Sequence, residues 1–348
     1  MQHRALLPLV ALSLFGCVPD LDTDEATVTT PRVLAVIAEP PEVAPGPVQP
    51  VQYRALVADA RGVRSDVPLT WFHCLAQKPL AELGPVSPDC FRVDSGRLAP
   101  FGQGGSVMAT VPATACSLFG PNPPPPVEGQ PPGRPVDPDE SGGYKIPVMV
   151  GVASQDGDDV VLYEQRIACG LSGVSPALGL EYSQRYHANR NPAGRELRVV
   201  RASGESIVAQ ESAPIEVAVG ERLELELAWT ACPASDACGD GVCGPDESRQ
   251  SCEADCARAL GCDGAERYLD FDREGQVLRV RRESMRIAWY ATAGKVERER
   301  TGVDETDLAS ASGNAWSAPA QPADVTLWMV LRDARGGVGV RQLAVRVR

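Results

Sequence analysis

An all-β protein built as two tandem β-sandwiches is the fold class that the sequence predicts. The 348 residues include 33 glycines and 31 prolines with only 5% aromatic residues, a composition that favours short strands joined by turns. Short apolar or alternating runs recur through the chain and fall in the same order in two halves. The hydrophobic content of 43% can fill real cores and excludes a wholly disordered chain.

Six strands are predicted in the first half, residues 32–170. They are Arg32 to Ala38, Val51 to Ala60, Leu69 to Cys74, Ser106 to Val111, Tyr144 to Ala153 and Val160 to Ala168. Three prolines between Glu39 and Gly46 remove backbone donors, so we expect a kinked edge strand there. Gln155-Asp156-Gly157 is expected to turn the last hairpin. Trp71 is expected to fill the core.

The second half, residues 195–348, repeats this plan. Its strands are Glu196 to Ala202, Arg222 to Thr230, Arg286 to Ala291, Val325 to Arg332 and Val338 to Val347, the last two joined by a turn at Arg335-Gly336-Gly337. Ile215 to Gly220 parallels Val43 to Gly46, and Trp289 matches Trp71. A single large β-domain remains the alternative, because strand patterns have low specificity.

The composition and placement of these strands resemble the immunoglobulin-like domains of bacterial surface lipoproteins. The resemblance covers most of residues 32 to 348. It implies two tandem immunoglobulin-like β-sandwiches with a small disulfide-rich insertion in the second, whose loops at the sandwich ends would serve recognition.

Three segments lie outside the predicted sandwiches. Residues 171–194 form a connector that permits a short helix before Asn191-Pro192. Residues 117–143 form a Pro-rich loop with nine prolines between Pro121 and Pro138, which predicts a polyproline or disordered insertion, either a solvated loop or a protein-recognition ligand. Residues 17–31 are acidic and Thr-rich, as expected of a tether that lifts the first domain off a membrane.

The N-terminus reads as an export signal. Residues 1–16 hold one basic residue, Arg4, and an apolar run too short to span a bilayer. Leu14-Phe15-Gly16-Cys17 resembles the lipobox of bacterial lipoproteins, which implies cleavage before Cys17, acylation of Cys17 and a lipid-anchored mature chain. The alternative is an ordinary secretory signal with an incidental Cys17. Val18 follows the cysteine, and the resemblance therefore favours the outer membrane.

Ten cysteines remain after Cys17, an even number that predicts five disulfides in an exported protein. They are Cys74, Cys90, Cys116, Cys169, Cys232, Cys238, Cys243, Cys252, Cys256 and Cys262. Four fall before residue 170 and six within residues 232–262, so we expect no bridge between the two groups. A zinc site around Cys252 and Cys256 is less favoured, because no histidine lies nearby.

The most specific motif lies within residues 232–262. Cys238-Gly239-Asp240-Gly241-Val242-Cys243 resembles a small Cys-Gly-Asp-Gly-x-Cys module of exported bacterial proteins. Such a piece is too small for a core of its own, so disulfides must hold it, with Cys232 and Cys262 closing its neck. Asp236, Asp240 and Glu247 fall at positions 1, 5 and 12 of a calcium loop, although position 3 is a cysteine. A knot with solvated acids is the alternative to a calcium site.

The net charge and the absence of catalytic motifs argue against several classes of function. The formal net charge is −13, which makes nucleic acid a poor partner. The mature chain holds two histidines, His73 and His187, and neither lies at metal-ligand spacing or in a serine-hydrolase pattern.

We therefore expect a non-enzymatic, outer-membrane-anchored module that contacts the membrane through its lipid and binds an envelope protein or polysaccharide. It would require no cofactor, apart from the calcium considered above. A structural spacer without a ligand and a secreted hydrolase that uses paired carboxylates are the alternatives.

Overall fold

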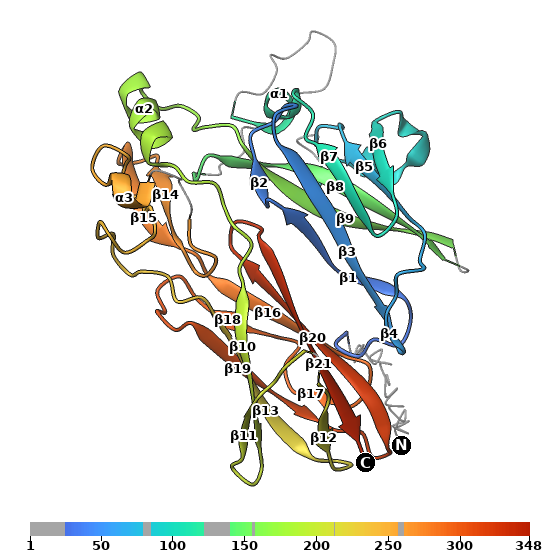
Figure 1. Cartoon of the computed structure of the whole chain (residues 1–348). Helices are drawn as coiled ribbons and strands as arrows, with labels where there is room; N and C mark the ends of the chain where they lie inside the picture. Colours follow the sequence, from blue (N-terminus) through green and yellow to red (C-terminus); the bar gives the residue numbers. More distant parts are fainter. Residues whose placement is uncertain (1–24, 79–84, 122–139, 155–156, 212, 257–260) are drawn as a thin grey trace, which may run out of the picture.

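Two β-sandwiches whose main strands follow the same order make up most of the computed structural model (Figure 1). The structure describes residues 25–78, 85–121, 140–154, 157–211, 213–256 and 261–348. Within these ranges no helix is both long enough and apolar enough to cross a bilayer. The predicted signal, Cys17, the Pro-rich stretch 122–139 and the turn residues 155–156 lie outside the described residues.

The first sandwich packs a sheet of four strands against a sheet of five. The four-stranded sheet has β1 (Arg32–Glu39), β3 (Pro50–Asp59), β4 (Gly62–Val63) and β7 (Ser106–Thr110), with β3 paired to the other three. The five-stranded sheet has the order β2 (Glu42–Val43), β9 (Gly157–Ala168), β8 (Gly143–Ser154), β5 (Leu69–Cys74) and β6 (Leu98–Gln103). Two short 3-10 helices, Pro88–Phe91 and Val93–Ser95, lie between β5 and β6, and the short helix α1 (Ala115–Phe119) lies between β7 and β8.

Sheets of five strands form both layers of the second sandwich. One has the order β11 (Ser206–Val208), β10 (Gly194–Arg201), β13 (Arg222–Trp229), β19 (Ala311–Ser317) and β17 (Lys295–Val296). The other has the order β12 (Ile215–Val217), β21 (Val338–Val347), β20 (Ala323–Asp333), β16 (Met285–Ala291) and β18 (Arg300–Val303).

The repeated plan and the immunoglobulin-like arrangement are confirmed. In each sandwich a short strand pairs in parallel with the last strand: β2 with β9, and β12 with β21. Trp71 on β5 is 0% exposed and Trp289 on the equivalent β16 is 1% exposed. Each indole N–H is satisfied, by the Gly104 carbonyl at 2.7 Å and the Thr301 hydroxyl at 2.9 Å. Two separate apolar cores replace the single large β-domain of the alternative.

The proline-rich edge of the first sandwich is kinked as predicted. Strand β1 pairs with β3 as far as Glu39, and the chain then turns through Pro40 and Pro41 into β2 of the opposite sheet. Because proline lacks a backbone donor, the chain leaves one ladder there and joins the other. The crossing places Glu42 beside Arg166 of β9.

Several strands were not predicted from the sequence. Strand β6 contains Pro100 and Gly102, β18 contains Gly302, and β19 contains Gly313, so none shows clear apolar alternation. The insertion in the second sandwich is also longer than predicted. After the cysteine-rich segment, with its short α3 (Glu253–Cys256), it continues as a hairpin of β14 (Arg267–Asp272) and β15 (Val277–Arg282).

The two sandwiches pack side by side along part of their length. Ala35 and Ile37 of β1 contact Ala288, Val330 and Val338 on the outer face of the second sandwich. That face would meet water in an isolated domain. Trp328, on the same face, is 0% exposed. The tandem sandwiches therefore share an apolar interface.

The end of the predicted tether is not free, which corrects the expectation for residues 17–31. Ala26 and Val28 are buried against the second sandwich. The Val28 amide donates to the Ala291 carbonyl at 2.8 Å, and the Ala291 amide donates to the Ala26 carbonyl at 2.9 Å. Val28 packs in one apolar cluster with Trp328, and Ala26 is also buried, so any tether ends at Glu25.

The connector contains helix α2 (Pro176–Arg185), capped by Ser175, whose hydroxyl accepts from the Leu178 amide at 3.2 Å. The helix ends at Arg185, earlier than Asn191-Pro192 was expected to stop it. Asn191 instead donates to the Ala38 carbonyl at 2.7 Å and accepts from the Val338 amide at 2.8 Å. The connector thus binds both sandwiches.

Replacing Trp71 or Trp289 by alanine should each lower the free energy of unfolding by about 3–5 kcal/mol, because each change leaves a large cavity in a filled core. The measurement is urea unfolding with the disulfides intact. Leu308→Ala is the control, since Leu308 is 67% exposed and should cost under about 0.5 kcal/mol. A small effect at both tryptophans would contradict the two-core plan.

Candidate functional site

Five disulfides join the ten cysteines of the described residues, and none links the two groups. Cys74 pairs with Cys90 and Cys116 with Cys169 in the first sandwich. In the insertion, Cys238 pairs with Cys252 and Cys243 with Cys256. Cys232 pairs with Cys262 and closes the neck around them. We call residues 232–262 the disulfide knot.

Asp255 organises the Gly-Asp-Gly turn of the knot. Its carboxylate accepts from the Gly239 amide at 2.6 Å and the Gly241 amide at 3.1 Å. Both glycines have positive φ, +99° and +85°, which side-chain-bearing residues rarely adopt. The motif therefore requires glycine at these two positions and a carboxylate facing them.

The three predicted calcium ligands are not brought together. Asp236 pairs with Arg267 and accepts from the Asp246 amide at 2.6 Å, while the exposed Asp240 accepts from the Val242 amide at 2.9 Å. Glu247 is buried, and one of its oxygens accepts from the Gly244 amide at 3.0 Å.

Within the described ranges, one set of metal-ligating residues has its donor atoms within 4.8 Å of one another: Cys238, Glu247, Cys252 and Asp255. Its two sulfurs are bridged to each other, and calcium prefers oxygen ligands. The sequence analysis did not single out Asp255, whose position just before Cys256 was the available signal.

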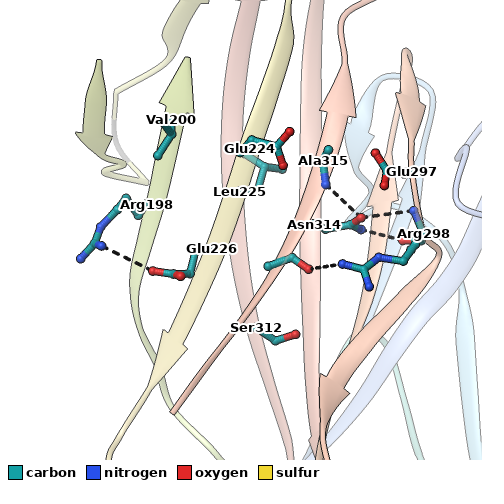
Figure 2. Close-up of a pocket in the computed structure, with 11 residues that line it drawn as sticks. Arg198, Val200, Glu224, Leu225, Glu226, Glu297, Arg298, Ser312, Asn314 and Ala315 are labelled. Carbon is teal, nitrogen blue, oxygen red and sulfur yellow. Dashed lines mark hydrogen bonds and ion pairs between the residues drawn. The ribbon is translucent and has the colours of Figure 1, made fainter. Parts of the chain in front are cut away.

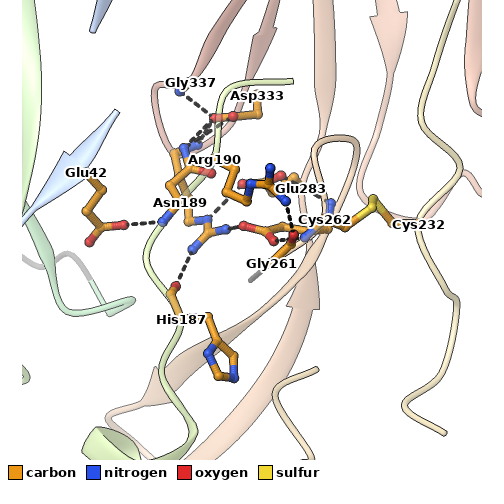
Figure 3. A network of polar contacts seen from close by, with 12 residues as sticks. Glu42, His187, Asn189, Arg190, Cys232, Gly261, Cys262, Glu283, Asp333 and Gly337 are labelled. Carbon is orange, nitrogen blue, oxygen red and sulfur yellow. Dashed lines mark hydrogen bonds and ion pairs between the residues drawn. A yellow bond between two sulfur atoms is a disulfide. The ribbon is translucent and has the colours of Figure 1, made fainter. Parts of the chain in front are cut away.

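A buried polar network lies where the two sandwiches, the connector and the knot meet (Figure 3). On the first sandwich, Glu42 pairs with Arg166 at 3.1 Å, with side chains 0% and 3% exposed. Glu42 also accepts from the Tyr186 hydroxyl and, at 2.8 Å, from the Asn189 amide of the connector. Asn189 in turn donates to Asp333 at the end of β20, at 3.1 Å. We call this network the junction.

Arg335 ties the knot to the junction. Its guanidinium donates to Glu283 at 2.8 Å and to Glu266, and it reaches the His187 carbonyl at 3.2 Å. Glu266 accepts from the Cys262 amide at 2.9 Å, directly at the neck of the knot. The side chains of Glu266, Glu283 and Arg335 are at most 5% exposed.

The junction buries more carboxyl groups than guanidinium groups. Its members in the described part of the chain are the carboxylates of Glu42, Glu266, Glu283 and Asp333 and the guanidiniums of Arg166 and Arg335. Burial, with Asp333 nearby, raises the pKa of Glu283 well above its usual range. Burial also raises the pKa of Asp333 to about 6, although backbone amides at Gly337 and Arg335 and the Asn189 side chain oppose this. No sequence pattern marked these residues.

An open groove of about 430 Å³ lies on the β10–β13–β19 face of the second sandwich (Figure 2). Glu226 stands opposite Arg198 on one side and Gly313 on the other, so the missing side chain at Gly313 lowers the floor. Arg298 donates to the Gly313 carbonyl at 3.1 Å. Glu224 and Glu297 complete a charged rim, each paired with Arg222.

The two histidines of the described residues occupy structural positions. His73 is 2% exposed and stacks on Phe101 with ring centroids 4.3 Å apart. Burial lowers its pKa to about 4. In the connector, the His187 Nε2 atom lies 3.3 Å from the Cys243 sulfur, which is bridged. Neither geometry assembles a nucleophile with a base.

Comparisons with known proteins find only distant structural likeness. No family model and no curated protein matches this sequence. The D0–D1 domain of intimin aligns with 91% of this chain and 99% of its own, at 7% identity and a TM-score of 0.19. The fibronectin(III)-like modules of Clostridium thermocellum CbhA align with 92% and 94%, at 8% identity and a TM-score of 0.20. These alignments support no conclusion about function.

Replacing Asp255 by alanine should destabilise the knot by about 1–3 kcal/mol, because two backbone amides lose a charged acceptor. Asp240→Ala is the matched control and should cost little, since Asp240 is exposed. The readout is the rate at which a thiol reductant opens Cys238–Cys252.

The wild type and one double variant test the calcium hypothesis. We expect millimolar calcium to leave the melting temperature of the wild type unchanged, because Arg267 engages Asp236 and a disulfide occupies the centre of the Glu247–Asp255 group. A rise that Glu247→Gln with Asp240→Asn abolishes would establish the calcium site instead.

Stability should fall as pH rises from 5 to 8. Asp333 has a folded-state pKa of about 6, above its unfolded value, so the native state holds the extra proton and loses this advantage as pH passes through 6. The expected loss from this group is about 1–2 kcal/mol. The measurement is chemical unfolding across this pH range.

Asp333→Asn should flatten this pH dependence, since the side chain no longer titrates. Asp324→Asn is the control, because its side chain is 84% exposed. An unchanged pH dependence in Asp333→Asn would show that titration of Asp333 does not cause the change of stability with pH.

Proposed function

We propose that this protein is an exported, lipid-anchored component of the bacterial outer membrane that acts as a non-enzymatic surface binding or adhesion module. The five disulfides carry the proposal, because such bridges form and persist in oxidising compartments outside the cytoplasm. The lipobox-like sequence ending at Cys17 supplies the anchor in this proposal.

The contacts between the two sandwiches support a rigid pair of domains. The two sandwiches share an apolar interface, and Asn189 of the connector links them by donating to Glu42 of the first and Asp333 of the second. A rigid pair presents loops and faces at a fixed orientation, which lowers the entropy lost when a partner binds. An envelope protein or a polysaccharide is the proposed partner. The groove of Figure 2, with Arg198, Glu226 and Arg298, offers hydrogen-bonding groups for either.

Cys17→Ser should release the protein from the membrane fraction, since no acyl chain can then be attached. The measurement combines fractionation with labelling by a clickable palmitate analogue. Intact mass after alkylation without reduction should add no label to the other ten cysteines. A Cys17→Ser protein that still sediments with membranes would contradict the anchor.

One set of proteins distinguishes a binding module from the two alternatives, a structural spacer and a carboxylate hydrolase. The Cys17→Ser chain should bind isolated cell envelopes saturably, and Glu226→Ala with Arg298→Ala should weaken that binding if the groove is used. No saturable binding would favour a spacer. Release of sugar or peptide fragments that Glu224→Gln with Glu226→Gln abolishes would favour the carboxylate hydrolase.

A further inference from the structure

The Cys238–Cys252 disulfide lies beside two carboxylates of the knot, those of Glu247 and Asp255. We propose that a dithiol opens this bond and that the two freed thiolates, together with the two carboxylates, then bind one zinc ion or a divalent cation of similar affinity for thiolates. The proposal goes beyond the binding role and does not depend on the anchor at Cys17. It gives the knot a metal site that exists only in its reduced form.

The four side chains converge on one place before any bond is broken. One donor atom of each, Sγ for the cysteines and a carboxylate oxygen for the acids, lies within 4.8 Å of the other three. The Cys252 sulfur lies 3.4 Å from an Asp255 oxygen. Neighbouring ligand atoms of a tetrahedral zinc site lie about 3.3–3.8 Å apart, given bond lengths of about 2.3 Å to sulfur and about 2.0–2.2 Å to oxygen. The Cα atoms of Cys238 and Cys252 are 5.4 Å apart, so rotation about the Cα–Cβ bonds can bring the freed sulfurs to that separation.

Glu247 carries the observation that points to a ligand. The residue is 6% exposed, and its carboxylate belongs to the group of four. One oxygen accepts from the Gly244 amide at 3.0 Å, whereas the other, Oε1, is buried and has no hydrogen-bond partner in the described part of the chain. A buried carboxylate oxygen without a partner is costly, and a cation beside it removes that cost.

Asp255 can serve as a ligand and still hold its turn. Each of its oxygens accepts from one backbone amide, that of Gly239 at 2.6 Å and that of Gly241 at 3.1 Å. A carboxylate oxygen has two lone pairs, so one lone pair stays available to a metal. Two thiolates and two carboxylates carry four negative charges against the two positive charges of zinc, and the amide dipoles offset part of that excess.

Cys238 makes this disulfide the one that a reductant reaches most easily. Of the ten cysteines in the described residues, only Cys238 is exposed, and its partner Cys252 is 2% exposed. Exchange requires a thiolate to attack a disulfide sulfur, so access to that sulfur limits the reaction. The bond beside the two carboxylates is therefore expected to open before the others.

The rest of the knot keeps the ligands in place when this bond opens. The Cys243–Cys256 bridge remains, and its two cysteines are 2% and 7% exposed. The Cys256 amide donates to the Cys252 carbonyl at 3.1 Å in α3, which fixes Cys252 relative to that bridge. Asp255 holds the turn that follows Cys238 through its two glycine amides. Both freed thiolates thus stay next to the carboxylates.

Electrons and protons balance in two steps. The dithiol gives two electrons and two protons to the disulfide and itself becomes a disulfide, while Cys238 and Cys252 become thiols. Zinc then replaces the two thiol protons, which pass to water, and the metal is neither oxidised nor reduced. Because zinc binds only the reduced form, its binding must favour reduction of this bond by the same factor by which reduction favours zinc.

The test uses the Cys17→Ser chain, which leaves only the ten paired cysteines. One equivalent of a phosphine, which becomes phosphine oxide with oxygen from water, opens the exposed bridge, and cobalt(II) is added as a spectroscopic probe for zinc. The expected result is one bound cobalt with a thiolate-to-cobalt charge-transfer band and the visible bands of a tetrahedral ion, displaced by zinc. A reduced protein that binds no cobalt overturns the inference, as does the same band in the unreduced protein.

Matched variants test the carboxylates. Glu247→Gln should weaken cobalt binding at least about tenfold, the loss typical even of residues that only support a ligand, while its amide oxygen can still accept from the Gly244 amide. Asp240→Asn is the control and should leave the affinity unchanged, because Asp240 is exposed and outside the group. Asp255→Asn is the second variant if Glu247→Gln does not form its disulfides. Unchanged affinity in the folded variant would contradict the proposed ligand set.

Alkylation of the reduced protein identifies the thiols. Label is expected at Cys238 and Cys252 alone, and zinc should slow that labelling several-fold because metal-bound thiolates react slowly. Label at Cys243 or Cys256 would show that the knot opens as a whole and would rule the site out. The double variant Cys238→Ser with Cys252→Ser should give no charge-transfer band. A band that persists there would place the metal on other cysteines, against the proposal.

Discussion

Two guanidinium groups, those of Arg166 and Arg335, hold three of the four carboxyl groups buried where both sandwiches, the connector and the knot meet. Asn189 and two backbone amides hold the fourth, that of Asp333. Taking these charges out of water costs several kcal/mol for each ion, and the protein recovers it only where partners are complete. Here Glu42 accepts from Arg166, Tyr186 and the Asn189 amide. Every element that contributes a partner is thereby fixed relative to the others.

The side chains at the junction need space beside the backbone of residues 142 and 143, which explains why both residues are glycine. A Cβ atom at Gly142 would lie 2.1 Å from the Tyr182 hydroxyl, and one at Gly143 would lie 1.9 Å from the Arg166 guanidinium. A side chain at position 143 would displace Arg166 of the junction, and one at position 142 would displace Tyr182, whose hydroxyl donates to the Ser141 carbonyl at 2.7 Å. The pair of glycines at the start of β8 thus serves the junction and not only the turn.

An apolar contact complements this polar one and gives the molecule its shape. Strand β1 and residues 25–28 cover the outer face of β16 and β20, so Trp328 is buried although it lies outside the core of its own sandwich. Together the two contacts turn a tandem pair into one arm with distinguishable ends.

Local sequence patterns alone determined much of the secondary structure and the disulfide grouping of this protein. Apolar alternation marked the main strands, the prolines after Glu39 marked the kink, and the even cysteine set marked two separate disulfide groups. These features depend on near neighbours in the chain, so they can be read from it. Tertiary structure decided the burial of Ala26 and Val28, the place of Asp255 opposite its glycines, and the junction of Glu42, Asp333 and Arg335. Those contacts span from 14 residues of sequence, between Gly241 and Asp255, to 300 residues, between Val28 and Trp328. A charged residue in a sequence looks the same whether it ends in water or in a buried ion pair.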